Sequence, residues 1–219
     1  MMIAPDTYYE LELKGSSKTH ILKEIRSLRK EIEEQKEKIE YSRIELTRWV
    51  KPSPFVIIEM NRLYLKEAKR ALEELNETYK PSRIERKGLE FNENINDLKS
   101  VRLEMGYLFR GYMSSEIDLS KTDPIIAVTD FDNKLLNRFS VKKDCFLKSL
   151  SDFYIGEWQS DYDPLRFGKG ILDGIQWTLK FAYDGKHKEV EISGSNDYPY
   201  NFKEFLELLK LGKYFDIVL

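Results

Sequence analysis

The sequence has few of the residues that mark secreted, metal-binding or disulfide-rich proteins. Its 219 residues include one cysteine, Cys145, and two histidines, His20 and His187. A single cysteine cannot form an intramolecular disulfide, which is typical of a reducing cytosol. We interpret Cys145 as a buried structural thiol on a helix flank rather than as a nucleophile. Because neither histidine has a Cys or His neighbour at ligand spacing, no zinc site is expected.

Long apolar runs and an excess of one charge are also missing. No run approaches the roughly 20 apolar residues that a membrane-spanning helix needs. The first residues do not join a basic stretch to an apolar one, so we expect no secretion signal. Lys and Arg number 36 against 38 Asp and Glu, and residues 1–80 carry 16 of these basic residues against 15 acidic ones. Neither part has the basic excess of a dedicated nucleic-acid binder. We therefore expect a cytoplasmic protein without a membrane or nucleic-acid partner.

Two stretches with heptad spacing dominate the first third of the chain. Apolar residues recur at steps of three and four over residues 21–49 and again over 58–79. Three polar residues interrupt these two seams: Gln35, Ser42 and Asn61. Pro52 separates the stretches, and Ser53-Pro54 is a typical helix start. The short connection predicts a long antiparallel, coiled-coil-like helical hairpin within an arm at residues 1–82. An arm with one buried seam favours a homodimer or a protein partner, although packing on the protein's own body is the alternative.

After the arm the sequence predicts a linker and then a sheet. Residues 83–99 are polar and contain a glycine, which indicates a linker. Within residues 100–219, apolar residues then alternate with polar ones, which is typical of strands with one wet face. The fold class is therefore α+β: the helical hairpin, followed by a mostly antiparallel β-sheet domain with two helices.

The clearest pattern in the chain lies between residues 171 and 212. Trp177, Leu179 and Phe181 alternate with polar residues, so all three side chains point to one face of a strand. A second strand follows, and the intervening Asp184-Gly185 favours a tight hairpin turn. Asn201 and Glu204 have the spacing of a capping box for the last helix, which Gly212 closes. The helix has one apolar stripe, and we expect that stripe to cover Trp177.

The loop between this hairpin and the last helix is the best candidate for a ligand site. It is dense in small polar groups, and two interpretations remain open. In the first, the polar side chains satisfy backbone groups of a rigid loop. In the second, an aromatic floor and polar groups line the rim of a binding cleft. The residues of this second interpretation are Gln176, Trp177, Ser195, Asn196 and Tyr198.

A second candidate is the pair Asp130 and Asp132, which follows an apolar stretch at residues 125–129. This arrangement resembles the first motif of the haloacid-dehalogenase phosphatases, which would imply a nucleophilic and a proton-transferring carboxylate. Such a pair could also hold Mg²⁺. Lys134 stands where that family usually has threonine, and no alternation of strands and helices follows. We therefore favour a hairpin turn. The acidic loop residues Asp161, Asp163 and Asp173 are the remaining metal candidates, and solvated carboxylates explain them more simply.

The C-terminal segment also carries a resemblance. Asp173-Gly174-x-Gln176-Trp177, then Gly194-Ser195-Asn196-x-Tyr198-Pro199-x-Asn201-Phe202, resembles a pattern in a group of uncharacterised bacterial proteins. Ala4-Pro5-Asp6-Thr7-Tyr8-Tyr9 is similar to the start of some members. The resemblance implies a bacterial cytosolic protein and brings no activity, cofactor or site residue.

No complete catalytic set accompanies these features, so we expect no cofactor and favour a non-enzymatic protein. The leading hypothesis is an interaction or assembly protein that uses the helical arm. The alternative is a small-molecule-binding or hydrolytic domain with its site near Gln176, Trp177, Ser195 and Asn196.

Overall fold

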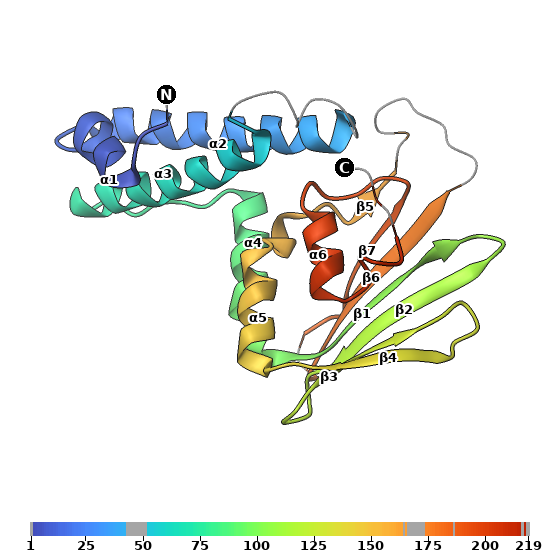
Figure 1. The fold of residues 1–219 in the computed structure, drawn as a ribbon. Coiled ribbons are helices and arrows are strands. Elements are labelled where there is room, and N and C mark those ends of the chain that lie inside the picture. The colour runs from blue at the N-terminus through green and yellow to red at the C-terminus, as the bar shows by residue number, and fades with distance from the viewer. Residues whose placement is uncertain are drawn as a thin grey trace. The chain divides into compact units, whose positions relative to one another are not determined.

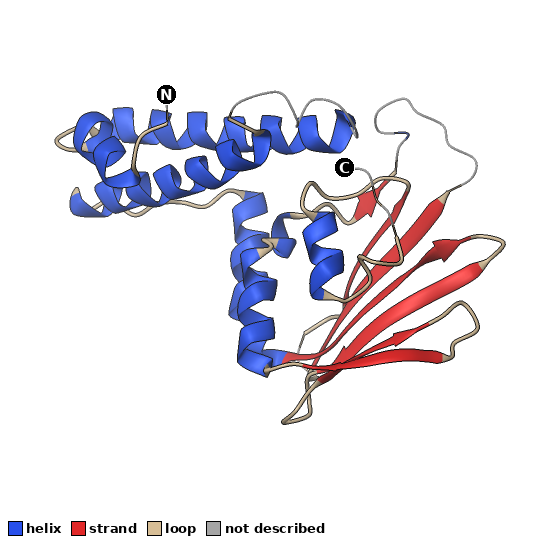
Figure 2. Ribbon diagram, in the orientation of Figure 1, coloured by secondary structure: helices blue, strands red, loops and turns tan. Residues whose placement is uncertain are grey.

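The chain has a mixed α and β fold. Its structure, a computed structural model, describes residues 2–42, 52–163, 165, 174–185, 187–215 and 217. Those residues form six α-helices and a seven-stranded, mostly antiparallel sheet. Two compact units divide the chain, with the boundary between Pro81 and Ser82. Figure 1 shows the elements, and Figure 2 separates the helices from the strands.

The first unit is helical. It contains α1 (Pro5–Tyr8), a π-helical turn η1 (Tyr9–Leu13), α2 (Lys18–Ser42) and α3 (Pro54–Glu74). Helices α2 and α3 lie side by side (Figure 1), and Lys18 Nζ is 2.7 Å from Glu77 Oε2, just beyond the end of α3. Their contact is built from predicted seam positions that are now buried: Ile21, Ile25, Leu28, Ile32, Gln35, Ile39, Ile58, Asn61, Ala68 and Leu72. The connection at residues 43–51, with the seam positions Leu46 and Trp49, lies outside the described residues.

The N-terminal segment packs on this helix pair. The ring of Tyr8 stacks on that of Tyr64 with centroids 4.2 Å apart. The Tyr64 hydroxyl donates to the Ile3 carbonyl (2.6 Å) and accepts from the Ile3 N–H (3.0 Å). Tyr8 and Tyr9 donate to the carboxylates of Glu24 and Glu74. These contacts extend the core of the unit beyond the two seams.

Helix α3 ends earlier than its heptad pattern predicts. It begins as expected, because the Ser53 hydroxyl accepts a hydrogen bond from Val56 N–H. It stops at Glu74, and Asn76 has the left-handed φ of 58° that is common just after a helix. The amide of Glu77 donates to the Leu72 carbonyl (3.2 Å), which closes the last turn. The prediction of a helix reaching Tyr79 is therefore wrong.

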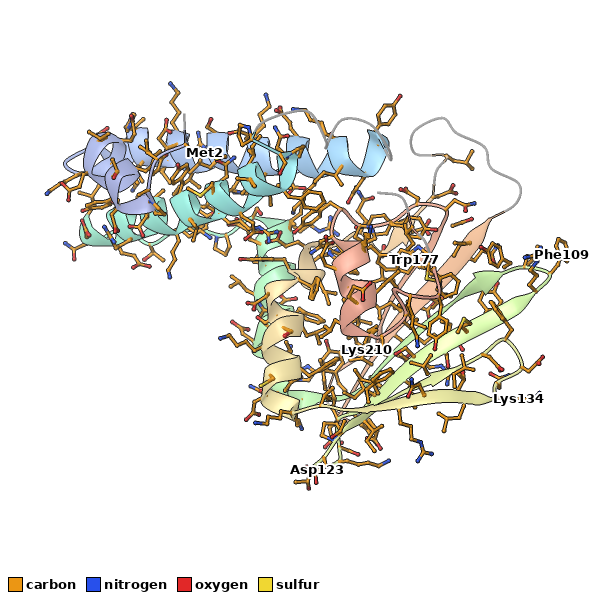
Figure 3. The ribbon with its side chains drawn as sticks, viewed as in Figure 1. Met2, Phe109, Asp123, Lys134, Trp177 and Lys210 are labelled. Carbon is orange, nitrogen blue, oxygen red and sulfur yellow. The ribbon has the colours of Figure 1, made fainter. Side chains whose placement is uncertain are left out.

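The second unit is built on the sheet. The strands are β1 (Leu98–Tyr107), β2 (Gly111–Asp118), β3 (Ile125–Thr129), β4 (Leu135–Ser140), β5 (Asp161–Tyr162), β6 (Ile175–Tyr183) and β7 (Val190–Ser195). Their order is β4-β3-β2-β1-β6-β7-β5, and only β5 pairs in parallel, with β7. At the hairpin tips, Phe109 is 86% exposed, and Lys134 lies at the neighbouring tip (Figure 3).

Helices cover one face of this sheet. They are α4 (Arg83–Glu93), α5 (Lys143–Asp152) and α6 (Phe202–Leu208), together with the 3₁₀ turns η2 (Ile95–Asp97) and η3 (Ile155–Glu157). Figure 2 shows the three α-helices on the same side of the strands. The alternating residues Trp177, Leu179 and Phe181 are each at most 1% exposed on that side. Trp177 packs on Phe202 of α6 with ring centroids 4.5 Å apart, which confirms the predicted cover.

Several local predictions are wrong. The segment 83–99 is not a linker, because it contains α4, η2 and the start of β1. The unit therefore has three α-helices rather than two. The predicted tight turn at Asp184-Gly185 is wrong, because β6 ends at Tyr183 and β7 begins only at Val190. Of the predicted turn pair, only Gly185 has a positive φ, of 63°. Helix α6 has no capping box, because the Asn201 amide donates to the Phe153 carbonyl (3.0 Å).

Candidate functional site

A pocket of about 340 Å³ lies in the second unit, where α4 meets the edge of the sheet. This volume falls in the range of roughly 300–1,000 Å³ typical of small-molecule sites. We call it the α4–β7 pocket. Its walls come from α4, from residues 155–160, and from the end of β6 with the start of β7. The lining residues are Lys87, Glu90, Phe91, Asn94, Ile155, Gly156, Trp158, Ser160, Tyr183, His187, Lys188, Val190, Glu191 and Ile192.

Helix α4 contributes one face to the pocket. Its pocket residues recur at steps of three and four between Lys87 and Asn94, the spacing that places side chains on one side of a helix. A complete capping box fixes where this helix begins: Glu85 N–H donates to the Ser82 hydroxyl (3.2 Å), and Ser82 N–H donates to the Glu85 carboxylate (2.8 Å). Phe91 is buried against Phe181 of β6, with ring centroids 5.2 Å apart. The helix is therefore anchored to the sheet beside the pocket.

The second wall packs on α4 through a close backbone contact at Gly156. A β-carbon on Gly156 would lie 2.6 Å from the Lys87 carbonyl oxygen, so only glycine fits there. Trp158 follows and is 7% exposed, with its ring 5.3 Å from that of Phe205. Its indole N–H is buried, and no hydrogen-bond acceptor for it occurs in the described part of the chain. This wall thus combines apolar surface with one unused donor.

The third wall, from the end of β6 and the start of β7, includes Tyr183 and His187. Tyr183 and His187 rings meet edge to face at 5.8 Å, and His187 Nε2 lies 3.6 Å from Asp97 Oδ2. Burial raises the pKa of Tyr183 above its ordinary value near 10, which further favours the neutral phenol. Lys87, Lys188 and Glu90 stand at the rim, exposed to solvent. The pocket therefore has an aromatic and aliphatic interior with a charged rim.

The structure places the five predicted ligand residues elsewhere, around the beginning of β6. The Trp177 indole N–H donates to the Asp197 carbonyl (2.8 Å), and both Trp177 and Tyr198 are buried. Gln176 pairs with Ser195 across the strands, and its side chain accepts from the Tyr112 hydroxyl (2.7 Å).

Asn196 supports a structural interpretation of this loop. Its carboxamide oxygen accepts from Ile175 N–H (2.8 Å), and its φ is 52°. A polar side chain thus satisfies a backbone donor, as the first of the two interpretations expects. None of the five residues lines the α4–β7 pocket.

The carboxylate candidates Asp130, Asp132 and Asp163 lie in turns or loops, and Asp161, which was predicted to lie in a loop, begins β5. Asp130 Oδ1 accepts from the N–H groups of Asp132 (3.0 Å) and Lys134 (2.8 Å), which is the hydrogen bonding of a hairpin turn. Asp163 accepts from Leu165 N–H (2.9 Å), and Asp173 lies outside the described residues. Across the residues that the structure describes, no group of three His, Cys, Asp or Glu side chains could hold a metal ion. Cys145 is exposed, so its predicted burial is wrong.

Sequence reasoning missed the pocket because its walls come from three separated segments. One local signal was present: Ser82 and Glu85 follow Pro81 with capping-box spacing, which would have indicated α4.

None of the helices among the described residues is long and apolar enough to cross a bilayer. Comparison with known protein families, with curated proteins and with solved structures finds no significant match to this chain. Its function must therefore be argued from its own geometry.

Proposed function

We propose that this protein is a non-enzymatic interaction protein that binds a ligand in the α4–β7 pocket. The observation that carries the proposal is the pocket itself, about 340 Å³ with an apolar interior that includes Phe91 and Trp158. Apolar walls with a few polar groups at the rim are typical of binding sites, because the walls supply affinity and the polar groups fix orientation. Lys87 and Lys188 at the rim favour a ligand that carries a negative charge.

The proposal can be tested with 1-anilinonaphthalene-8-sulfonate, an aromatic anion that fluoresces when it leaves water. We expect saturable binding to the full chain and at least tenfold weaker binding to Val190→Trp, because the added ring fills the pocket. Ile125→Trp is the matched control: Ile125 is 41% exposed against 36% for Val190, and it does not line the pocket. Equal binding by Val190→Trp and the wild type would remove the pocket as the site.

A second candidate function is self-association through the first unit. We propose that α2 and α3 form an antiparallel, coiled-coil-like hairpin and that two such arms pair in a homodimer. Two exposed apolar residues of α3 support this, Val56 at 48% and Leu63 at 46%. They are one heptad apart and so lie on the same side of the helix.

The alternative expected from the sequence, a small-molecule site near Gln176 and Ser195, is a weaker proposal because Trp177 and Tyr198 are buried in the core.

A further inference from the structure

The sheet ends at the α4–β7 pocket with part of an edge strand uncovered. Strand β5 pairs with β7 only at Ser193 and Gly194. In the part of the chain that the structure describes, no strand pairs with residues 190–192 of β7 on that side. These residues line the pocket. An uncovered edge presents N–H and C=O groups that another chain can bind.

Hydrogen bonds in β7 and at the residue that follows it show which backbone groups face the pocket edge. Asn196 N–H donates to Ile175 O (2.8 Å) on the β6 side, whereas Ser193 N–H donates to Ser160 O (3.1 Å) on the β5 side. Successive N–H groups of a strand point in opposite directions, so Glu191 N–H and C=O point to the same side as those of Ser193. Glu191 is therefore the backbone position that presents a donor and an acceptor at the uncovered edge.

The side chains of β7 divide in the same way. Val190 and Ile192 pair with Phe181 and Leu179 on the helix-covered face, and both line the pocket. The Glu191 carboxylate lies on the other face, 3.1 Å from Lys180 Nζ. The pocket therefore joins a strand edge to an apolar wall, and the Glu191 carboxylate is turned away from that wall.

We propose that the occupant of the α4–β7 pocket is an extended segment of another polypeptide, which adds to β7 as a short parallel or antiparallel strand. Its backbone bonds to Glu191 N–H and C=O, and one apolar side chain enters between Phe91, Trp158 and Val190. In strand addition, main-chain hydrogen bonds supply affinity and pockets for alternate side chains supply specificity. This inference rests on the proposed function, because it names the ligand of the same pocket.

The charge at the rim indicates the composition of that segment. Lys87 and Lys188 line the pocket and form no ion pair with any residue that the structure describes, and the acidic lining residues are Glu90 and Glu191. His187 lies near Asp97. Since the Glu191 carboxylate is directed to Lys180 on the opposite face, two lysines face one carboxylate at the rim. A segment with an acidic residue next to its apolar residue fits this arrangement.

The probe is a library of random peptides of about seven residues displayed on phage, selected on the full-length protein and counter-selected on Val190→Trp. We expect enriched peptides that place an apolar residue beside an acidic one. Synthetic copies are then methylated at one backbone nitrogen at a time. Methylation at alternate positions should weaken binding about tenfold, because only every second amide of a strand faces β7. Peptides that tolerate methylation at every position would overturn strand addition.

A pair of protein variants tests the same hydrogen bond from the other side. Glu191→Pro removes the outward N–H, and Glu191→Ala removes the same carboxylate but keeps that N–H. We expect Glu191→Pro to bind the selected peptide about tenfold more weakly than Glu191→Ala, with equal binding of the fluorescent anion by the two. Equal peptide affinity of Glu191→Pro and Glu191→Ala would overturn strand addition, although the pocket would still be a binding site for the anion. If neither the anion nor any peptide binds in a way that Val190→Trp abolishes, the proposed function itself fails.

Discussion

Trp177 contacts the rings of Tyr162, Tyr198 and Phe202, at centroid separations of 5.7, 6.4 and 4.5 Å. Gly194 on the adjacent strand leaves room for the indole, since a β-carbon there would lie 2.5 Å from Trp177 Nε1. Because the Trp177 side chain is enclosed on all these sides, it contributes to the stability of the second unit through its packing contacts.

We therefore expect Trp177→Ala to lower the free energy of unfolding by about 3–5 kcal/mol, the typical result of truncating a buried aromatic residue. Lys180→Ala, on the opposite face of the same strand, should cost little because it removes only an exposed ion pair. Urea denaturation of both variants makes the comparison. Coincident midpoints for Trp177→Ala and the wild type would contradict the packing role.

Tyr8 provides a second test at this scale, because burial and the Glu24 carboxylate raise its pKa above the ordinary value near 10. Folding therefore favours the neutral phenol of Tyr8. The stability that this preference adds to the folded protein is fully present below about pH 10. It is lost as the pH rises beyond the pKa of Tyr8 in the unfolded chain.

Tyr8→Phe should cost about 1 kcal/mol at pH 8, where it removes the hydrogen bond to Glu24. The difference from wild type should shrink as the pH rises above about 10, since phenylalanine has no proton to lose. Denaturation at pH 8 and pH 11 measures both values. A difference that widens with pH would show that the sign of this argument is wrong.

At the scale of elements, α4 depends on its first turn. Phe91 is its only buried residue, so capping and not core packing limits where the helix begins. Ser82→Ala should cost about 1 kcal/mol, the usual effect of losing a serine cap, and Ser82→Thr should retain most of the stability. Because α4 forms one wall of the pocket, the alanine variant should also bind the fluorescent anion more weakly. Equal stability of the Ala and Thr variants would exclude a role for the cap.

The longer strands were predictable, whereas α4 and the two-residue β5 were not. Each of the strands β1, β6 and β7 has one dry face, which imposes alternation on its sequence, so Val101, Leu103 and Met105 reveal β1. Helix α4 buries so little that its polar composition is similar to that of a linker. The capping box assigned to Asn201 failed because a tertiary partner, the Phe153 carbonyl, takes its side chain. Local spacing cannot report such a contact.

The candidate site was harder still to predict. The lining residues come from segments 87–94, 155–160 and 183–192, which are far apart in sequence and meet only in the folded unit, where β7 lies near the end of the sheet order. Gln176 and Asn196, which looked functional by composition, satisfy their neighbours. Polar density in a loop indicates hydrogen bonding, but the partner can be the loop itself.

At the scale of the whole molecule, the chain combines a helical unit and a sheet unit, each with its own core. In the helical unit the core is formed by α2, α3 and the N-terminal segment, and the exposed side of α3 still carries Val56 and Leu63. Each of these side chains is about half exposed, so burying it contributes roughly half of the 1.5–3 kcal/mol typical of a fully exposed one, and a two-fold axis would bury both residues on each of the two arms.

We expect the full-length protein to form a homodimer in sedimentation equilibrium at about 10–100 μM, the range where micromolar affinities are measurable. Leu63→Glu should shift it toward monomer, because a carboxylate at the interface would lose its water. Leu75→Glu is the control: Leu75 is 43% exposed in the same unit, lies beyond the end of α3 and is not on the side of Val56 and Leu63. A wild type that stays monomeric over this range would end the dimer proposal. A dimer disrupted by Leu75→Glu but not by Leu63→Glu would place the interface elsewhere on the arm.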